Sequence, residues 1–306
     1  MAEKTGIAWC DSTWNPWIGC TKVSPGCDHC YAAEQDSRKR WDGGKTHWGA
    51  GVPRYRTSAS NWVQPIAWNK KAAKSGEVHR VFCASLADVF DNEIDLTWRL
   101  DLWQLIEKTP NLSWLLVTKR IGNVPAMVPA WMHNGFPTNV RILITVVNQE
   151  EADRDVPKLL ALSCKNGISY EPALGPVDWS PWLWPMCWHW DAKYRSPEDA
   201  IAAGAYAEQK PQGLVSAHRK FLEWIIVGGE SGPKARPFDI DWAYSTVAQC
   251  KGASVPCFVK QLGVSAFFEP TEFHESIEGR EYHFKDRAGA DPAEWPEHLR
   301  VREFPK

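Results

Sequence analysis

Short runs of apolar, β-branched residues recur along the chain, and small or polar residues follow each of them. Continuous apolar character is typical of parallel strands that are covered on both faces of a sheet. Segments with helical spacing lie between the runs, at residues 96–108, 151–162 and 241–251. The six runs predicted to be strands are His79–Ser85, Ser113–Thr118, Arg141–Val147, Gly167–Glu171, Trp224–Gly228 and Val255–Lys260.

The alternation of strands and helices predicts an α/β fold, as a (β/α) barrel requires. A further short strand is expected around Gly6–Ser12. Two segments, at about 35–78 and 175–223, interrupt the alternation of strands and helices and are interpreted as insertions over the site. A helix is predicted in the second segment, near Pro197–Gln209. Residues 1–263 are then one partial barrel, and residues 264–306 are a small C-terminal extension.

Composition narrows the class of protein. With 306 residues, 44% hydrophobic and 24% charged residues and a net charge of −2, the chain has the profile of a soluble globular protein. The sequence has no basic start followed by an apolar run and no stretch of eighteen apolar residues, so we expect a cytoplasmic protein without a membrane partner. In that reducing compartment nine cysteines are not expected to form a disulfide framework.

One segment is strongly basic. Residues 35–80 contain ten Lys or Arg against three Asp or Glu, with Trp and Tyr interleaved. This pattern favours contact with nucleic acid, whereas a solvated loop is the alternative. The nineteen tryptophans either fill core volume or stack on bases. The cations expected to neutralise phosphates are Arg38, Lys39, Arg40, Arg54 and Arg56.

A cysteine loop near the N-terminus is the clearest chemical signal. The segment TWNPWIGCTKVSPGCDHCYAAE separates Cys20, Cys27 and Cys30 by six and two residues, which indicates a metal site. A [4Fe–4S] cluster usually has four thiolates, so a three-cysteine loop leaves one iron open to an external ligand such as S-adenosylmethionine (SAM). The alternative is a zinc site completed by Cys10 or His29. The absence of a second CxxC favours the cluster. The other cysteines lack ligand spacing and are expected as buried thiols: Cys83, Cys164, Cys187, Cys250 and Cys257.

The cysteine segment, the later LLVTKR, and WIIVGGESGPKARP followed by VPCFVKQLG together resemble a phage- and prophage-associated family of uncharacterised proteins regarded as radical-SAM-like. The resemblance covers most of residues 5–265. It implies an incomplete (β/α) barrel of the radical SAM type, a cluster on Cys20, Cys27 and Cys30, and bound SAM. In radical SAM chemistry the reduced cluster gives one electron to the sulfonium, and a 5′-deoxyadenosyl radical then abstracts hydrogen from the substrate.

The loop departs from the usual radical SAM pattern, which has three and then two residues between its cysteines and an aromatic residue before the third. Here His29 takes the place of that aromatic residue. Tyr31 is therefore an equal candidate for covering the adenine.

Polar residues directly after the predicted strands are further site candidates, because ligands of parallel α/β folds lie at the carboxyl ends of the strands. Asp88, Lys119 and Asn148 suit the ammonium, carboxylate and ribose of SAM, although such residues are often helix caps or surface residues. The full set is Ser85, Asp88, Thr118, Lys119, Arg120, Asn148, Gln149, Glu171, Gly228, Gly229, Glu230, Ser231, Lys260 and Gln261.

Within this set, Ser85, Glu171 and Gly228–Glu230 are assigned to the cofactor, and Lys260 and Gln261 to the substrate. The GGES sequence resembles the element that holds the SAM ammonium in many radical SAM enzymes. It follows a late strand instead of the second, so it either approaches the substrate or forms a tight turn.

Two functions follow. The first is a radical SAM enzyme that acts on a nucleotide, nucleic acid or related polar substrate in phage-linked modification or repair, with a flavodoxin- or ferredoxin-like reductant. The second is a zinc-stabilised, non-catalytic nucleic-acid-binding protein. A dependence on a partner that supplies the substrate or electrons is a third possibility.

Overall fold

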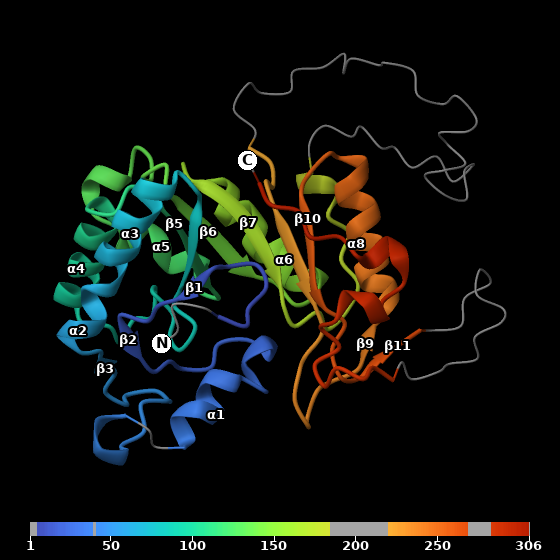
Figure 1. Cartoon of the computed structure of the whole chain (residues 1–306), viewed down its shortest axis with the longest axis horizontal. Coiled ribbons are helices and arrows are strands. Elements are labelled where there is room, and N and C mark those ends of the chain that lie inside the picture. Colours follow the sequence, from blue (N-terminus) through green and yellow to red (C-terminus); the bar gives the residue numbers. More distant parts are fainter. Residues whose placement is uncertain (1–4, 39–40, 184–219, 269–282, 306) are drawn as a thin grey trace, which may run out of the picture.

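A seven-stranded parallel sheet forms the centre of the protein (Figure 1). The computed structural model describes residues 5–38, 41–183, 220–268 and 283–305. The strand order is β1-β4-β5-β6-β7-β8-β10, and every neighbouring pair is parallel. The strands are β1 (Ser12–Thr13), β4 (His79–Cys83), β5 (Leu112–Thr118), β6 (Val140–Thr145), β7 (Lys165–Tyr170), β8 (Ile225–Gly228) and β10 (Cys257–Gln261).

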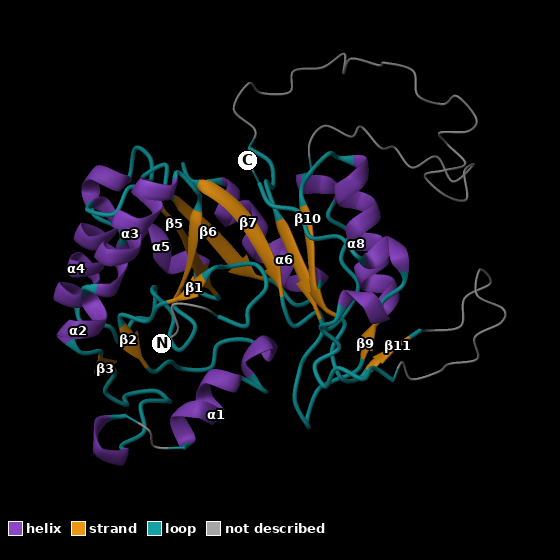
Figure 2. Ribbon diagram, in the orientation of Figure 1, coloured by secondary structure: helices purple, strands orange, loops and turns teal. Residues whose placement is uncertain are grey.

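The sheet is curved but open, because β1 and β10 lie at its two edges and do not pair with each other (Figure 2). The fold is therefore α/β with an incomplete (β/α) barrel, as expected. All six predicted strands are confirmed, with bounds that differ by a few residues. The expected first strand exists as β1, but it begins at Ser12, later than predicted.

The three predicted helices are confirmed as α4 (Leu96–Glu107), α6 (Gln149–Leu160) and α8 (Ile240–Gly252). Each begins at a side chain that accepts a hydrogen bond from the first turn, and these caps are Asp95, Asn148 and Asp239. Shorter elements are β2 (Trp17–Ile18), α1 (Tyr31–Ser37), β3 (Tyr55–Arg56), α2 (Ala59–Trp62), α5 (Val124–Met127), β9 (Phe238–Asp239) and β11 (Ala266–Phe267).

The segment at 35–78 is only partly an insertion over the site. It contains α3 (Gln64–Ser75), which packs against β4 and β5 and ends at Gly76 with a left-handed φ of 72°. This helix therefore belongs to the outer layer of the α/β fold. Before this helix the segment contains β3, which pairs antiparallel with β2 beside the cysteine loop.

Two hydrophobic cores follow from the alternation of side chains along the strands. The larger core joins the sheet to the helices and contains Trp103 of α4 and Val156 of α6. The smaller core lies on the other face of the sheet. It contains the alternate strand residues, such as Leu115 and Ile226, together with Trp9 from the N-terminal segment. Ten tryptophans of the described part of the chain are buried, which agrees with a space-filling role for these indoles: Trp9, Trp14, Trp17, Trp68, Trp103, Trp114, Trp179, Trp182, Trp224 and Trp295.

Most of the segment expected as a second insertion, 175–223, lies outside the described residues, as do the helix predicted near Pro197–Gln209 and Cys187. The described end of the C-terminal extension lies along β10. Val259 N donates to Val301 O at 2.8 Å, and Glu303 N donates to Cys257 O at 2.9 Å. These contacts cover an edge strand that would otherwise expose unpaired backbone groups. Among the described helices, none is long and apolar enough to cross a membrane.

Candidate functional site

The cysteine loop leaves the sheet after β1 and folds across the carboxyl ends of β5 and β6. Cys27 ends a short 3-10 helix, Pro25–Cys27, which Ser24 caps, and Cys30 is the residue before α1. The loop passes close to the strands at Gly26. A Cβ atom there would lie 2.8 Å from Val147 Cγ1, so only glycine permits this approach.

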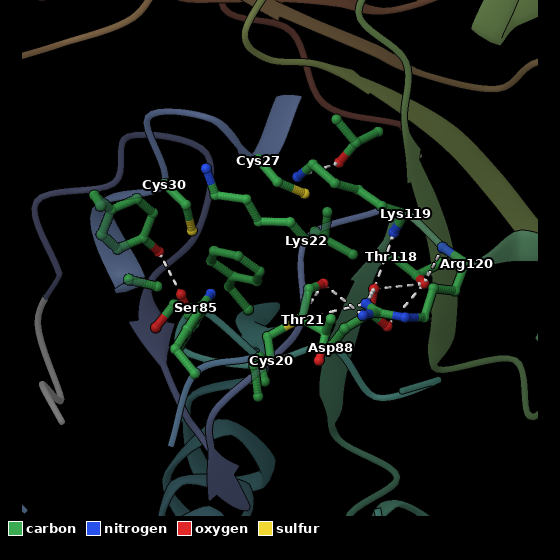
Figure 3. A pocket seen from close by; sticks show the side chains of 18 residues that line it. Cys20, Thr21, Lys22, Cys27, Cys30, Ser85, Asp88, Thr118, Lys119 and Arg120 are labelled. Atoms are coloured by element: carbon green, nitrogen blue, oxygen red, sulfur yellow. Dashed lines mark hydrogen bonds and ion pairs between the residues drawn. The ribbon is translucent and has the colours of Figure 1, made fainter. Parts of the chain in front are cut away.

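Cys20, Cys27 and Cys30 line one cavity of about 120 Å³ (Figure 3). One water molecule needs roughly 10–15 Å³ by this kind of measure, so the cavity has room for a polyatomic group. Within the described part of the chain, no three His, Cys, Asp or Glu side chains are grouped closely enough to hold one metal ion. The three thiols therefore line a cavity and do not surround the position of a single metal ion.

Four of the predicted cofactor residues also line this cavity: Tyr31, Ser85, Asp88 and Lys119. They come from α1 and from the ends of β4 and β5. The Tyr31 hydroxyl donates to Ser85 O at 2.7 Å, and Lys119 Nζ lies 3.3 Å from Thr145 Oγ1 at the end of β6. Strand-end position was therefore a good guide to the location of Ser85, Asp88 and Lys119 at the cavity, whereas Tyr31 was named from its place beside Cys30.

Asp88 organises the ends of β4 and β5. Its carboxylate accepts hydrogen bonds from the Thr118 hydroxyl at 2.8 Å and the Lys119 backbone N–H at 3.0 Å. It also accepts from Arg120 Nη1 at 3.1 Å (Figure 3). With so many donors fixed on it, Asp88 acts here as a structural anion and not as an open acceptor for an ammonium group.

Burial, together with the negative charge of Asp88, raises the pKa of the Cys20 thiol to about 12. The nearby Arg120 guanidinium opposes this rise, and its Nη1 lies 3.3 Å from Cys20 Sγ. A metal that binds Cys20 would therefore displace a proton from the thiol, as metal–thiolate formation generally does.

The second half of the cysteine loop is fixed by the segment after β8. Glu230 Oε2 lies 3.1 Å from His29 Nδ1, and Arg236 Nη2 lies 2.5 Å from Glu230 Oε1. Arg236 Nη1 also donates to Pro25 O at 3.0 Å. Burial alone would raise the pKa of Glu230, but the hydrogen bonds from Arg236 and His29 outweigh it and lower that pKa. Glu230 and His29 were predicted to contact the cofactor, and the structure instead pairs them with each other.

The glycines of GGES have a packing role. A Cβ atom at Gly229 would lie 2.5 Å from Leu262 O, and one at Gly228 would lie 3.1 Å from Gln261 O. Gln261 Nε2 donates to Gly229 O at 2.8 Å, so this side chain joins β10 to the segment that follows β8. Neither glycine lines the cysteine cavity, and neither has the positive φ of a tight glycine turn, so the role that the contacts show is close packing against the end of β10.

Two other predicted contacts are engaged within the protein. Asn148 caps α6 by accepting from Glu151 N at 3.0 Å, which is the helix-cap alternative. Glu171, after β7, pairs with Lys260 of β10 at 2.9 Å. These residues lie at the same edge of the sheet as the cavity without lining it.

The basic segment contributes less to the site than its composition suggests. Arg54 is buried and pairs with Asp91 at 2.9 Å, so the prediction that it contacts phosphate is wrong. Arg56 pairs with Asp101 at 2.6 Å and stacks on the Trp62 ring at 4.5 Å. Arg38 is half exposed beside Glu34, whereas Lys39 and Arg40 lie outside the described residues.

Sequence reasoning did not assign Thr21, Lys22, Trp48 or Thr145 to the cofactor, although all four line the cavity. Lys22 and Thr21 directly follow Cys20, and Thr145 ends β6, so position was an available signal for three of them. Trp48 carried no comparable signal, because it reaches the cavity from the loop between α1 and β3.

The fold and the site define an incomplete (β/α) barrel protein with a cysteine-lined cavity at the carboxyl ends of its strands. A family model described as "Protein of unknown function (DUF5131)" matches residues 4–288, and the chain belongs to this family.

Two solved structures of spore photoproduct lyase are similar in outline. A Cys→Ser mutant has 12% sequence identity and a TM-score of 0.38, covering 90% of this chain and 69% of its own. A Cys→Ala mutant has 11% identity and a TM-score of 0.36, covering 88% and 67%. No curated protein matches the sequence.

Proposed function

We propose that this protein is a radical SAM enzyme that carries a [4Fe–4S] cluster on Cys20, Cys27 and Cys30. The observation that supports this most strongly is that three thiols line one cavity while both residues considered as a fourth zinc ligand are engaged elsewhere. Cys10 lies in the smaller core, and its thiol faces Ile7 O at 3.8 Å. His29 is paired with Glu230.

The donor set fits the cluster. Iron–sulfur clusters are held by cysteine thiolates, and three ligands for four irons leave one iron for an external molecule. When bound, the cluster would supply the single electron that cleaves SAM in this class of enzyme.

The other residues of the cavity suit a polar, negatively charged ligand. Lys22, Lys119 and Arg120 line it, against the single carboxylate of Asp88. Arg120 is bound to Asp88, and Lys22 pairs with Asp28 at 3.7 Å, so Lys119 is the cation best placed to bind the carboxylate of SAM or a substrate anion. Tyr31 and Trp48 add aromatic surface on which an adenine could stack.

The test is SAM cleavage by the full chain. After anaerobic reconstitution with iron and sulfide, we expect broad visible absorption, bound iron and sulfide, and formation of 5′-deoxyadenosine when dithionite and SAM are added. A protein that takes up no iron and sulfide under these conditions would refute the proposal. One bound zinc ion per chain would support the zinc-stabilised binding protein instead.

We further propose that the substrate is a nucleotide or nucleic acid, in phage-linked modification or repair, with electrons from a flavodoxin- or ferredoxin-like reductant. The net positive charge of residues 35–80 supports this substrate class, as do the cations of the cavity. Arg38 is the described cation of that segment nearest to the cysteine loop in sequence, because it directly follows α1.

Binding of a labelled single-stranded oligonucleotide should therefore weaken steeply as salt rises from about 50 to 200 mM. Arg38→Gln should reduce the slope of log K against log salt by about 0.7, the value for one lost phosphate contact on a single strand. Arg154→Gln is the matched control, because the two side chains are 52% and 50% exposed and each pairs with a carboxylate. If Arg38→Gln and Arg154→Gln give the same slope, Arg38 does not contact the nucleic acid. Binding that does not depend on salt would contradict the proposed substrate class.

A further inference from the structure

Arg120 links the cysteine loop to the carboxylates at the end of the sheet. Its Nη1 lies 3.3 Å from Cys20 Sγ and 3.1 Å from Asp88 Oδ2. Its Nη2 donates to Thr21 O at 2.7 Å and lies 3.8 Å from Asp91 Oδ1. One guanidinium thus contacts a candidate cluster ligand, the backbone next to it and two acidic side chains, of which Figure 3 shows Asp88.

The position of this guanidinium is fixed by its surroundings. Its side chain is only 7% exposed, as is that of Asp88. Asp88 is held by Thr118 and by backbone N–H groups of Phe90 and Lys119, so the carboxylate that orients Arg120 cannot easily turn away. Both terminal nitrogens of Arg120 are engaged, which makes it a poor candidate for binding the carboxylate of an incoming ligand.

Arg120 also distinguishes Cys20 from the other two cysteines of the loop. Among the described contacts, neither Cys27 nor Cys30 is within hydrogen-bond distance of a charged side chain, whereas Cys20 has a cationic N–H donor at 3.3 Å. A hydrogen bond from a cation to a ligand sulfur stabilises the extra negative charge of a reduced cluster. Such bonds are among the features that set iron–sulfur reduction potentials.

We propose that Arg120 is a positioning residue that holds Cys20 as a cluster ligand and raises the reduction potential of the cluster. This inference rests on the proposed function, because it needs the cluster. Arg120 thus makes the cluster easier to reduce. Other residues of the cavity bind SAM and the substrate.

The test is a redox titration of the reconstituted full chain, followed by electron paramagnetic resonance. Arg120→Gln removes the charge and the sulfur contact, and should make reduction at least tenfold less favourable, a fall of about 59 mV for a one-electron couple. Arg120→Lys keeps the charge without the forked geometry and should give a smaller fall in the same direction.

Arg99→Lys is the matched control. Arg99 is buried and donates to Val89 O at 3.1 Å and Asp91 O at 2.8 Å, so it supports the same loop as Asp88 without a sulfur contact. The reduction potential of the cluster in Arg99→Lys should equal that of the wild type. If circular dichroism shows that Arg120→Gln does not fold, the two lysine variants are compared instead. The reduction potential of Arg120→Lys should then be lower than that of Arg99→Lys.

The outcomes separate this inference from the proposed function. A wild-type chain without iron and sulfide refutes the function before any variant is compared. A wild-type chain with a cluster, and a potential that does not move in Arg120→Gln or Arg120→Lys, refutes only the role of Arg120. An equal fall in Arg99→Lys also refutes it, because the effect would then come from loosening the loop at 88–91.

Discussion

Replacing Cys27 with alanine is expected to abolish the formation of 5′-deoxyadenosine and to lower bound iron to background. Cys27 lies at the end of the short 3-10 helix and lines the cavity together with Cys20 and Cys30. Without it, two irons of a four-iron cluster would lack a protein ligand. Because loss of residues that merely orient metal ligands already costs 10–100-fold, we expect removal of a ligand to reduce SAM cleavage by more than about 100-fold.

Cys164→Ala is the matched control for this variant. Cys164 is partly buried and lies outside the cavity, and burial raises the pKa of its thiol to about 12. Its replacement should leave iron content and 5′-deoxyadenosine formation unchanged. The assignment of the three ligands fails if Cys27→Ala retains its cluster and activity, or if Cys164→Ala loses them to the same extent.

The strands of the sheet were predictable because most of them are buried on both faces. A run such as Arg141–Val147 is apolar at nearly every position, since one side meets the helices and the other meets the smaller core. β1 was placed too early for the opposite reason. It has only two residues, Ser12 and Thr13, and it is a strand because it pairs with β4 rather than because of an apolar run.

The position of the site was predictable, but the pairing of its side chains was not. Parallel strands bring Ser85, Asp88 and Lys119 to one edge of the sheet, and the cavity lies there. Strand order does not say which polar side chains neutralise one another. Glu230 and Lys260 looked like open ligands for this reason, whereas they are paired with Arg236 and Glu171.

Local composition was least informative for the basic segment. Arg54 and Arg38 contribute equally to its positive charge, yet one is buried and the other half exposed. The arginine that the fold encloses is marked by its tertiary partner, Asp91, which lies 37 residues away in the sequence. No pattern within the segment itself carries that information.

Arg54→Met is expected to lower the free energy of unfolding by about 3–5 kcal/mol, the typical cost of removing one partner from a buried ion pair. The Arg54 guanidinium donates to Asp91 Oδ2 at 2.9 Å and to Thr21 Oγ1 at 2.6 Å. It also donates to the backbone oxygens of His47, Gly49 and Val52, at 2.9–3.0 Å. Methionine would leave the Asp91 carboxylate and these carbonyl groups buried without their donor.

Urea denaturation of Arg54→Met beside Arg38→Met tests this role. Arg38 is exposed and pairs with Glu34 one helical turn away, so its replacement should cost no more than about 1 kcal/mol. Because Arg54 also bonds Thr21, next to Cys20, its loss should lower the cluster content of the folded fraction while Arg38→Met leaves it unchanged. If the two variants unfold at the same urea concentration, Arg54 does not fasten the basic segment to the cysteine loop and the loop is held chiefly by Arg120 and Arg236.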